Sequence, residues 1–312
     1  MYFPYLRGRQ YELLALRELA QNDLIGSKVT PIIEPVKPSA TLTKTIIEYV
    51  HKNKEIAFIT NPLVGNFSAD FNALKEEKVR DSLISSLRKE NVIVSHILNQ
   101  NSCFQIPRLL FEQGFSNEKL LLICEDKDYI NYFFEFFQEE VPRYCLIPEE
   151  STFRRKIKHN KVLVADRFTK QERNADYSSI DESPFSEDHL YFKEDGFIGF
   201  SDYSIVGKRY FESGFAPYAV AIHIVFLAED NSLRIKHFVS DSNDDFNDPA
   251  GKFYEAVKKL AEWQEEMKLD TFGISEFLRH FKNGTYPGLG TVKKLSIMHH
   301  IELVSKFLDG VE

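Results

Sequence analysis

The chain has 312 residues, of which 43% are hydrophobic, and its 47 acidic and 39 basic residues give a formal net charge of −8. This hydrophobic content supports a sizeable core and argues against an intrinsically disordered chain. No apolar run is long enough for a transmembrane helix, so no contact with a membrane is expected. The acidic balance disfavours nucleic acid as a direct ligand, because proteins that bind it through overall charge are basic.

Cysteine usage and the first residues both favour a cytoplasmic protein. The three cysteines, Cys103, Cys124 and Cys145, lack the paired spacing of a zinc site, and their odd number argues against a disulfide framework. The opening stretch, MYFPYLRGRQ, lacks the basic and then apolar layout of a secretory signal peptide. We therefore expect the cytoplasm as the compartment.

Eight short apolar runs recur along the chain and are separated by helical patterns. They cover residues 2–6, 29–34, 56–61, 92–98, 120–125, 144–148, 162–166 and 197–201. Because the runs are nearly continuous rather than alternating, they are typical of parallel strands buried on both faces. Eight such strands alternating with helices predict a (β/α)8 TIM-like barrel of the α/β class, with an open doubly wound sheet as the alternative. A Rossmann fold is disfavoured, since residues 5–9 lack the glycine-rich turn that binds a dinucleotide.

Three further segments interrupt or follow the barrel pattern. Residues 168–195 are polar and rich in turn-forming residues, which predicts a long loop after the seventh strand. Two alternating runs within residues 218–241 flank a polar turn and predict a β-hairpin inserted after the eighth strand, over the C-terminal face of the barrel. Asp248 and Pro249 are typical of a helix start, and residues 248–312 are expected to form a helical cap. No clear linker divides the chain, so residues 1–312 are interpreted as one domain.

Polar residues gather where the predicted strands end. In a (β/α)8 barrel the strand ends aim these side chains into one shared mouth, where the chemistry of such barrels takes place. The candidates at this face are Arg7, Arg9, Glu34, Lys37, Asn61, Asp166, Asp202 and Tyr203, together with Glu125 and Asp126. Each of them, taken alone, is also compatible with a helix cap, an ion pair or a solvated loop. Asp202 stands out, because neighbouring aromatic residues would partly desolvate its carboxylate and perturb its pKa.

Two other groups extend the candidate site. Lys208 follows Gly207 after the eighth strand, where many barrels bind phosphate through a glycine turn, and a solvent-facing helix start fits this segment equally. His223 and His237 occupy facing arms of the hairpin, and with Asp241 they could bind a metal or act as acid and base. Packed, hydrogen-bonded histidines are the alternative, and no short-spaced metal motif identifies a metal.

Several motifs resemble the phage "beta protein" family and its bacterial relatives. They are MYFPYLRGRQYEL at residues 1–13, PIIEPV at 31–36 and GFSDYSIVG at 199–207, and two more, AIH at 221–223 and HFVSD at 237–241, are similar to strands of a bacterial subgroup. The resemblance covers most of the chain. It implies the site residues Arg7, Glu34, Asp202, Tyr203, His223, His237 and Asp241, without a catalytic role for any of them. Genes of such relatives lie near mobile elements and phage-defence genes, sometimes beside a small companion gene with a nuclease-like look.

Two functional hypotheses follow, and whether the chain is an enzyme stays open between them. In the first, the barrel binds or processes a phosphorylated or nucleotide-like small molecule. Its phosphate would be neutralised by Arg7, Arg9, Lys37 and Lys208. The candidate catalytic residues are Asp202, Glu34, His223 and His237, and Asp202 with Glu34 or Asp166 would act as general base or hold Mg²⁺. In the second, the chain is a non-catalytic phage-defence or regulatory module whose hairpin and preceding loop bind a companion protein.

Overall fold

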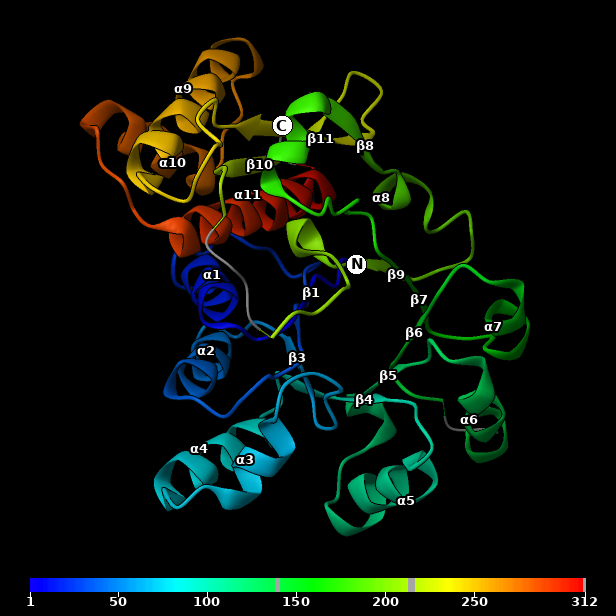
Figure 1. Cartoon of the computed structure of the whole chain (residues 1–312). Coiled ribbons are helices and arrows are strands. Elements are labelled where there is room, and N and C mark those ends of the chain that lie inside the picture. Colours follow the sequence, from blue (N-terminus) through cyan, green and yellow to red (C-terminus); the bar gives the residue numbers. More distant parts are fainter. Residues whose placement is uncertain (138–140, 213–216, 311–312) are drawn as a thin grey trace.

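The computed structural model describes residues 1–137, 141–212 and 217–310, and within them eight parallel strands form a ring (Figure 1). In order around the ring they are β1 (Tyr5–Leu6), β2 (Ile32–Ile33), β3 (Ile56–Ile59), β4 (Val92–Ile97), β5 (Leu120–Ile123), β6 (Tyr144–Ile147), β7 (Lys161–Ala165) and β9 (Gly199–Asp202). A parallel bridge between Tyr2 and Phe200 closes the ring, and the Phe3 N–H donates to the Phe200 carbonyl at 2.9 Å. The predicted TIM-like barrel is confirmed, with a bridge in place of a longer ladder at the closing seam.

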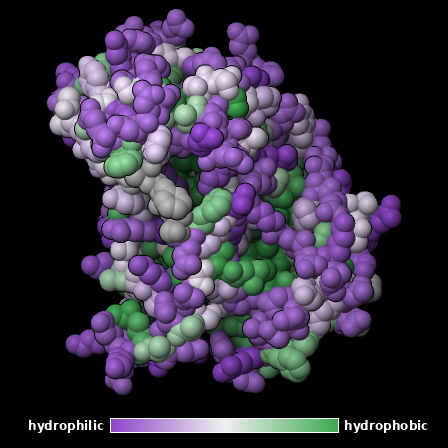
Figure 2. All heavy atoms as spheres, in the orientation of Figure 1, coloured by the Kyte–Doolittle hydropathy of each residue, from purple (hydrophilic) through white to green (hydrophobic). Residues whose placement is uncertain are grey.

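Two layers of apolar side chains result from the alternation of side chains along the strands. The inner layer consists of Phe3, Tyr5, Ile32, Ala57, Ile59, Ile93, Ile97, Leu121, Ile123, Tyr144, Leu146, Val162, Val164 and Tyr203. Neighbouring strand residues such as Ile33, Phe58 and Leu122 belong to the second layer, under the helices. Figure 2 shows hydrophobic residues in the middle of the visible face, surrounded by a mostly hydrophilic exterior.

Helices cover the outside of the barrel between successive strands (Figure 1). They are α1 (Gln10–Gln21), α2 (Ala40–His51), α3 (Phe67–Ala73), α4 (Glu77–Leu87), α5 (Ser102–Pro107), α6 (Ile130–Phe136) and α7 (Ser151–Lys156). Shorter helical turns lie at Arg108–Glu112, Asn117–Lys119, Lys127–Tyr129 and Ser204–Val206. Local sequence sets several of these boundaries. At the start of α2, for example, the Ser39 hydroxyl accepts the Leu42 N–H at 3.1 Å and caps the helix.

A second sheet of three antiparallel strands lies beside the barrel, in the order β10 (Ala221–Leu227), β11 (Leu233–Val239) and β8 (Glu182–Ser186). The predicted hairpin is therefore present, as β10 and β11. The prediction of one long loop over residues 168–195 is wrong, because this segment also holds a 3-10 helix (Asn174–Ser179), β8 and α8 (Asp188–Tyr191). β8 carries no continuous apolar run, because only one of its side chains is buried and it is held by backbone pairing with β11.

The C-terminal helices connect the second sheet to the barrel. α9 (Pro249–Met267) begins at Asp248 and Pro249 as predicted, with the Asp248 carboxylate accepting the Gly251 N–H at 2.9 Å. The Trp263 ring of α9 packs on Phe226 and Phe238, with centroids 5.2 and 5.4 Å away. α10 (Phe272–Asn283) packs against both α9 and α11.

α11 (Leu289–Asp309) lies between the second sheet and α1, as Figure 1 shows. On one side His299 Nε2 lies 2.5 Å from the Val225 carbonyl of β10, and on the other Lys293 donates to Glu12 of α1 at 2.8 Å. α11 therefore takes the place of the eighth outer helix of the barrel. No helix in the described part of the chain is both long and apolar enough to cross a membrane.

Candidate functional site at the barrel mouth

A buried ion pair joins the ends of the first two barrel strands. Arg7 follows β1, Glu34 follows β2, and the guanidinium binds the carboxylate directly. The same carboxylate accepts hydrogen bonds from the Tyr5 hydroxyl at 2.9 Å and from the Leu63 N–H at 2.8 Å. Glu34 is 1% exposed, so protein donors replace the water that a carboxylate would otherwise bind. Glu34 is thus a fixed part of the barrel wall.

Arg7 is held as firmly as its partner. Its guanidinium lies over the rings of Tyr5 and Tyr203, at 5.0 and 5.1 Å from their centroids, and donates to the Lys208 carbonyl at 2.5 Å. Burial is the largest single influence and lowers the pKa of Arg7, but Glu34, Tyr5 and Tyr203 together outweigh it, so the pKa is raised. The predicted residues Arg7, Glu34 and Tyr203 are therefore brought together in one buried network, in which Arg7 Nε is the atom without a hydrogen-bond partner among the described residues.

The loop after β9 turns back across the mouth at Gly207, whose φ of 77° favours glycine. This turn places Lys208 against two other strand ends. Its N–H donates to Asp166 after β7 at 2.9 Å, and its ammonium binds Glu125 after β5 at 2.7 Å. The Tyr203 hydroxyl donates to the same Glu125 oxygen at 3.3 Å. The predicted residues Asp166, Tyr203 and Lys208 thus meet at the mouth.

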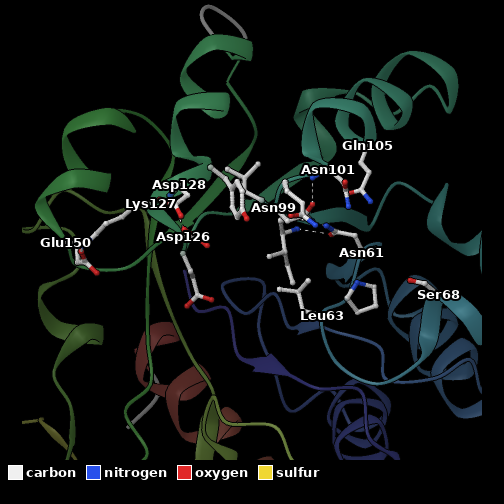
Figure 3. Close-up of a pocket in the computed structure, with 16 residues that line it drawn as sticks. Asn61, Leu63, Ser68, Asn99, Asn101, Gln105, Asp126, Lys127, Asp128 and Glu150 are labelled. Carbon is white, nitrogen blue, oxygen red and sulfur yellow. Dashed lines mark hydrogen bonds and ion pairs between the residues drawn. The ribbon is translucent and has the colours of Figure 1, made fainter.

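A pocket of about 920 Å³ opens at the ends of β3 to β6 (Figure 3). The labelled side chains show carboxamides on one side of this mouth pocket and carboxylates on the other. Its polar lining consists of Asn61, Ser68, Asn99, Gln100, Asn101, Gln105, Glu125, Asp126, Lys127, Asp128 and Glu150. Of the residues predicted to bind a ligand, Asn61 lies here, beside the strand-end carboxylates Glu125 and Asp126.

The carboxamides of the mouth pocket differ in what they can still bind. Asn61 accepts the Ile97 N–H at 2.9 Å and donates to the Ile97 carbonyl at 2.8 Å, so it fastens β3 to β4. Gln105 Oε1 is buried and has no hydrogen-bond partner among the described residues. Leaving such an atom unsatisfied costs about 1–3 kcal/mol, so a rotation of the Gln105 carboxamide that turns Oε1 toward a donor in the pocket is favoured. Apart from Asn61, sequence reasoning missed this side of the pocket, although an amide run, residues 99–101, directly follows the fourth apolar run.

A buried histidine and serine support the amide side from below. His96 Nε2 on β4 lies 2.9 Å from Ser102 Oγ, and that hydroxyl accepts the Asn99 N–H at 2.9 Å. Burial lowers the pKa of His96 to about 4, so the ring is neutral at physiological pH. The distance from His96 Nε2 to Ser102 Oγ would suit a serine nucleophile and its general base, but both side chains are fully buried. The pair positions the loop that carries the carboxamides.

Asp202 lies away from the mouth, on the side of β9 that faces α11. Its Oδ1 accepts the Tyr2 hydroxyl at 2.9 Å and the Ser204 N–H at 2.8 Å, and His300 Nε2 lies 3.7 Å from its Oδ2. Burial raises the pKa of Asp202 to about 7. The expected perturbation is present, but the expected position at the mouth is wrong, because the side chain leaves the strand on the outer face.

The two hairpin histidines face each other directly, with Nδ1 atoms 2.9 Å apart. The Tyr177 ring packs on both, at 4.6 Å from each centroid. Burial lowers the pKa of His223 to about 3 and that of His237 to about 4, and for His223 the neighbouring imidazole lowers it further. Both rings are therefore neutral near pH 7, and one Nδ1–H is shared between them. Asp241 does not join them, since it binds Lys259 at 2.6 Å.

The remaining predicted cations lie outside the ion-pair network. Arg9 lies over the Tyr210 ring at 4.8 Å, and Lys37 is exposed in the loop after β2. The carboxylates expected to hold Mg²⁺ are not brought together, since Asp202 faces α11 while Glu34 is bound by Arg7. Within residues 1–137, 141–212 and 217–310, no group of three or more His, Cys, Asp or Glu side chains is placed to hold a metal.

Comparisons with protein-family models, with curated proteins and with solved structures found no match to this chain. The resemblance to the phage beta protein family accordingly stays a prediction from sequence.

Proposed function

We propose that the mouth of this barrel binds a phosphorylated, nucleotide-like small molecule. The observation that carries the proposal is the mouth pocket of about 920 Å³, with carboxamides along one side and carboxylates along the other (Figure 3). This volume falls within the range of small-molecule sites, roughly 300–1,000 Å³. Carboxamides donate and accept hydrogen bonds together, as the edges of nucleobases require, and carboxylates accept from sugar hydroxyls. A nucleoside matches both sides of the pocket.

Two further observations support a ligand that also carries phosphate. The pocket lies at the carboxyl ends of parallel strands, where barrel proteins bind their ligands. Lys208 borders it, because its ammonium binds Glu125, which is part of the pocket lining. The Lys208 side chain is half exposed, so it can turn from Glu125 toward an anionic group. The phosphorylated end of the ligand would therefore point toward the loop after β9.

The second hypothesis, a companion protein bound by the hairpin, stays a prediction without comparable support. β11 is paired on both edges, with β10 and with β8, and Trp263 covers two of the hairpin phenylalanines. β11 is thus the central strand of the sheet, whereas β10 pairs with β11 alone among the described strands, so any partner strand would have to add to the outer edge of β10.

The proposal is tested by thermal-shift and calorimetric titrations with the common nucleosides and their 5′-monophosphates. A ligand present at a hundred times its Kd adds about 2.7 kcal/mol to the free energy of unfolding, which raises the Tm measurably. Gln105→Ala should weaken the binding of the responding nucleoside about tenfold, because a hydrogen bond formed inside the pocket is lost.

Gln21→Ala is the matched control, since Gln21 is an exposed amide on α1, far from the pocket lining. It should bind as the unmodified protein does. If no nucleoside or nucleotide shifts the Tm, or if Gln105→Ala and Gln21→Ala bind equally well, the proposal is wrong.

A further inference from the structure

Four cationic side chains from four separate segments meet at the rim of the barrel, beside the ends of β7 and β9. Arg9 precedes α1, Lys170 follows β7, Arg209 follows β9, and Lys293 belongs to α11. Lys170 and Arg209 both lie over the ring of Phe211, at 4.8 and 4.6 Å from its centroid. Partial burial lowers the pKa of Lys170, and Lys293, Arg9 and Arg209 lower it further. The four cations, here called the basic rim, are thus close enough to repel one another.

Carboxylates compensate this charge only in part. Glu12 is fully buried and bound by Lys293, and Asp166 accepts the Lys208 N–H. Asp166 raises the pKa of Lys170, but its effect is smaller than that of any of the three cations that lower it. Among the described residues, Arg9, Lys170 and Arg209 form no ion pair with a carboxylate. Unneutralised cations gathered by the fold favour the binding of an anion.

A cavity of about 290 Å³ lies under the basic rim, between the barrel loops, β10 and α11. Lys170 and Lys293 both line it, and so do hydrogen-bonding groups from Asn174, Tyr177 and Ser296. His223 also lines the cavity as a neutral imidazole, and Glu172 is the carboxylate in the lining. The space is far smaller than the mouth pocket, so it suits a compact anion with several acceptor oxygens.

We infer that the basic rim and the cavity beneath it bind the phosphoryl group of a small-molecule phosphoester. Several cations and hydroxyl or amide donors around a small space are the groups that phosphate oxygens require. A polynucleotide is the less favoured source of that phosphate, because the protein carries a net charge of −8 and the cations are confined to one spot. The inference rests on the proposed function for the rest of the ligand, which would extend past Lys208 into the mouth pocket.

The test is calorimetric titration with inorganic pyrophosphate at constant ionic strength. The unmodified protein should bind it, and Lys170→Ala and Arg209→Ala should each weaken binding by about tenfold, through loss of one charge-assisted contact. Both side chains are exposed, so the variants are expected to fold. Lys44→Ala, which removes an exposed lysine of α2, is the matched control and should leave the affinity unchanged.

The inference is overturned if the unmodified protein fails to bind pyrophosphate, or if all three variants bind it alike. It is also overturned if a thymidine oligonucleotide binds more tightly and displaces pyrophosphate, since the site then serves a polynucleotide. Titration with the responding nucleoside separates this failure from failure of the proposed function. Lys170→Ala should leave the nucleoside affinity unchanged, whereas Gln105→Ala should reduce it and leave pyrophosphate binding intact.

Discussion

At the scale of single residues, the side from which a side chain leaves its strand decides its role. Asp202 and Tyr203 are neighbours, and successive strand side chains point to opposite faces. Tyr203 reaches the barrel interior and Glu125, whereas Asp202 reaches Tyr2 and His300. An apolar neighbourhood for Asp202 could be predicted from its aromatic neighbours in sequence. Its direction could not, because inside and outside are distinguished only when the barrel closes.

The free energy of unfolding of the Asp202→Asn variant should fall less with rising pH than that of the unmodified protein. Burial raises the folded-state pKa of Asp202 from 3.8 to about 7. The stability contributed by the protonated carboxyl is therefore complete below the unfolded-state pKa and is lost as the pH rises through the folded-state pKa. Asparagine stays neutral throughout. The advantage of Asp202→Asn in free energy of unfolding should grow across this window by at most ~4 kcal/mol, at 1.36 kcal/mol per pKa unit.

Urea unfolding of both proteins near pH 4 and near pH 8 measures this difference, because contributions from buried histidines away from Asp202 are common to both and cancel. Asp270→Asn, at a carboxylate whose side chain is 97% exposed, serves as the control and should show no trend. If the free energies of unfolding of Asp202→Asn and the unmodified protein differ by the same amount at both pH values, the raised pKa of the buried Asp202 carboxyl is contradicted.

At the scale of secondary-structure elements, burial decides what can be predicted from sequence. The eight barrel strands were predictable because each is an apolar run covered on both sides. β8 was not, since its side chains are mostly exposed and its backbone pairing with β11 leaves no pattern in the residues. Apart from Asn61, the carboxamides of the mouth pocket were missed for a related reason. They lie in the loop after β4 and at the start of α5, where function depends on three-dimensional neighbours such as His96 and Ser102 and not on spacing.

The Arg7–Glu34 pair links the ends of β1 and β2. Replacing one partner of this pair should lower the free energy of unfolding more than replacing both. Arg7→Met leaves the Glu34 carboxylate buried without its cation and should lower the free energy of unfolding by about 3–5 kcal/mol. Adding Glu34→Gln removes the second charge and should recover part of that loss. Urea unfolding of the four proteins of this double-mutant cycle gives the coupling energy.

The exposed pair of Lys52 and Asp23, 2.8 Å apart, provides the comparison for this cycle. Lys52→Met should cost about 1 kcal/mol or less, as solvent-exposed pairs do. A coupling energy for Arg7 and Glu34 no larger than the cost of Lys52→Met would show that the buried pair does not stabilise the strand ends.

At the scale of the whole molecule, the barrel depends on its closing seam. Tyr2 is fully buried, stacks on Phe200 with centroids 5.0 Å apart, and donates to Asp202. Tyr2→Ala should therefore lower the free energy of unfolding by about 3–5 kcal/mol, as other buried aromatic truncations do. Hydrogen exchange should show the loss first at the Phe3 and Phe200 amides, which form the seam.

Tyr191→Ala, at a tyrosine that is 47% exposed, controls for the loss of an aromatic ring at the surface and should leave exchange at the seam unchanged. If Tyr2→Ala changes exchange equally in β4 and β5, which lie across the ring, the seam is no weaker than the rest of the barrel and the prediction fails.

The seam also determines when the fold can be completed during synthesis. The amino group of Met1 donates to the Ile198 carbonyl, 197 residues along the chain, and α11, the outer helix that packs on α1, is made after every strand. A nascent chain that leaves the ribosome N-terminus first must therefore carry the unpaired edge of the first strand until β9 emerges. Unpaired edges of this kind recruit other strands. Folding of this protein during translation should accordingly depend on protection of its first strand, by a chaperone or by transient contacts within the growing chain.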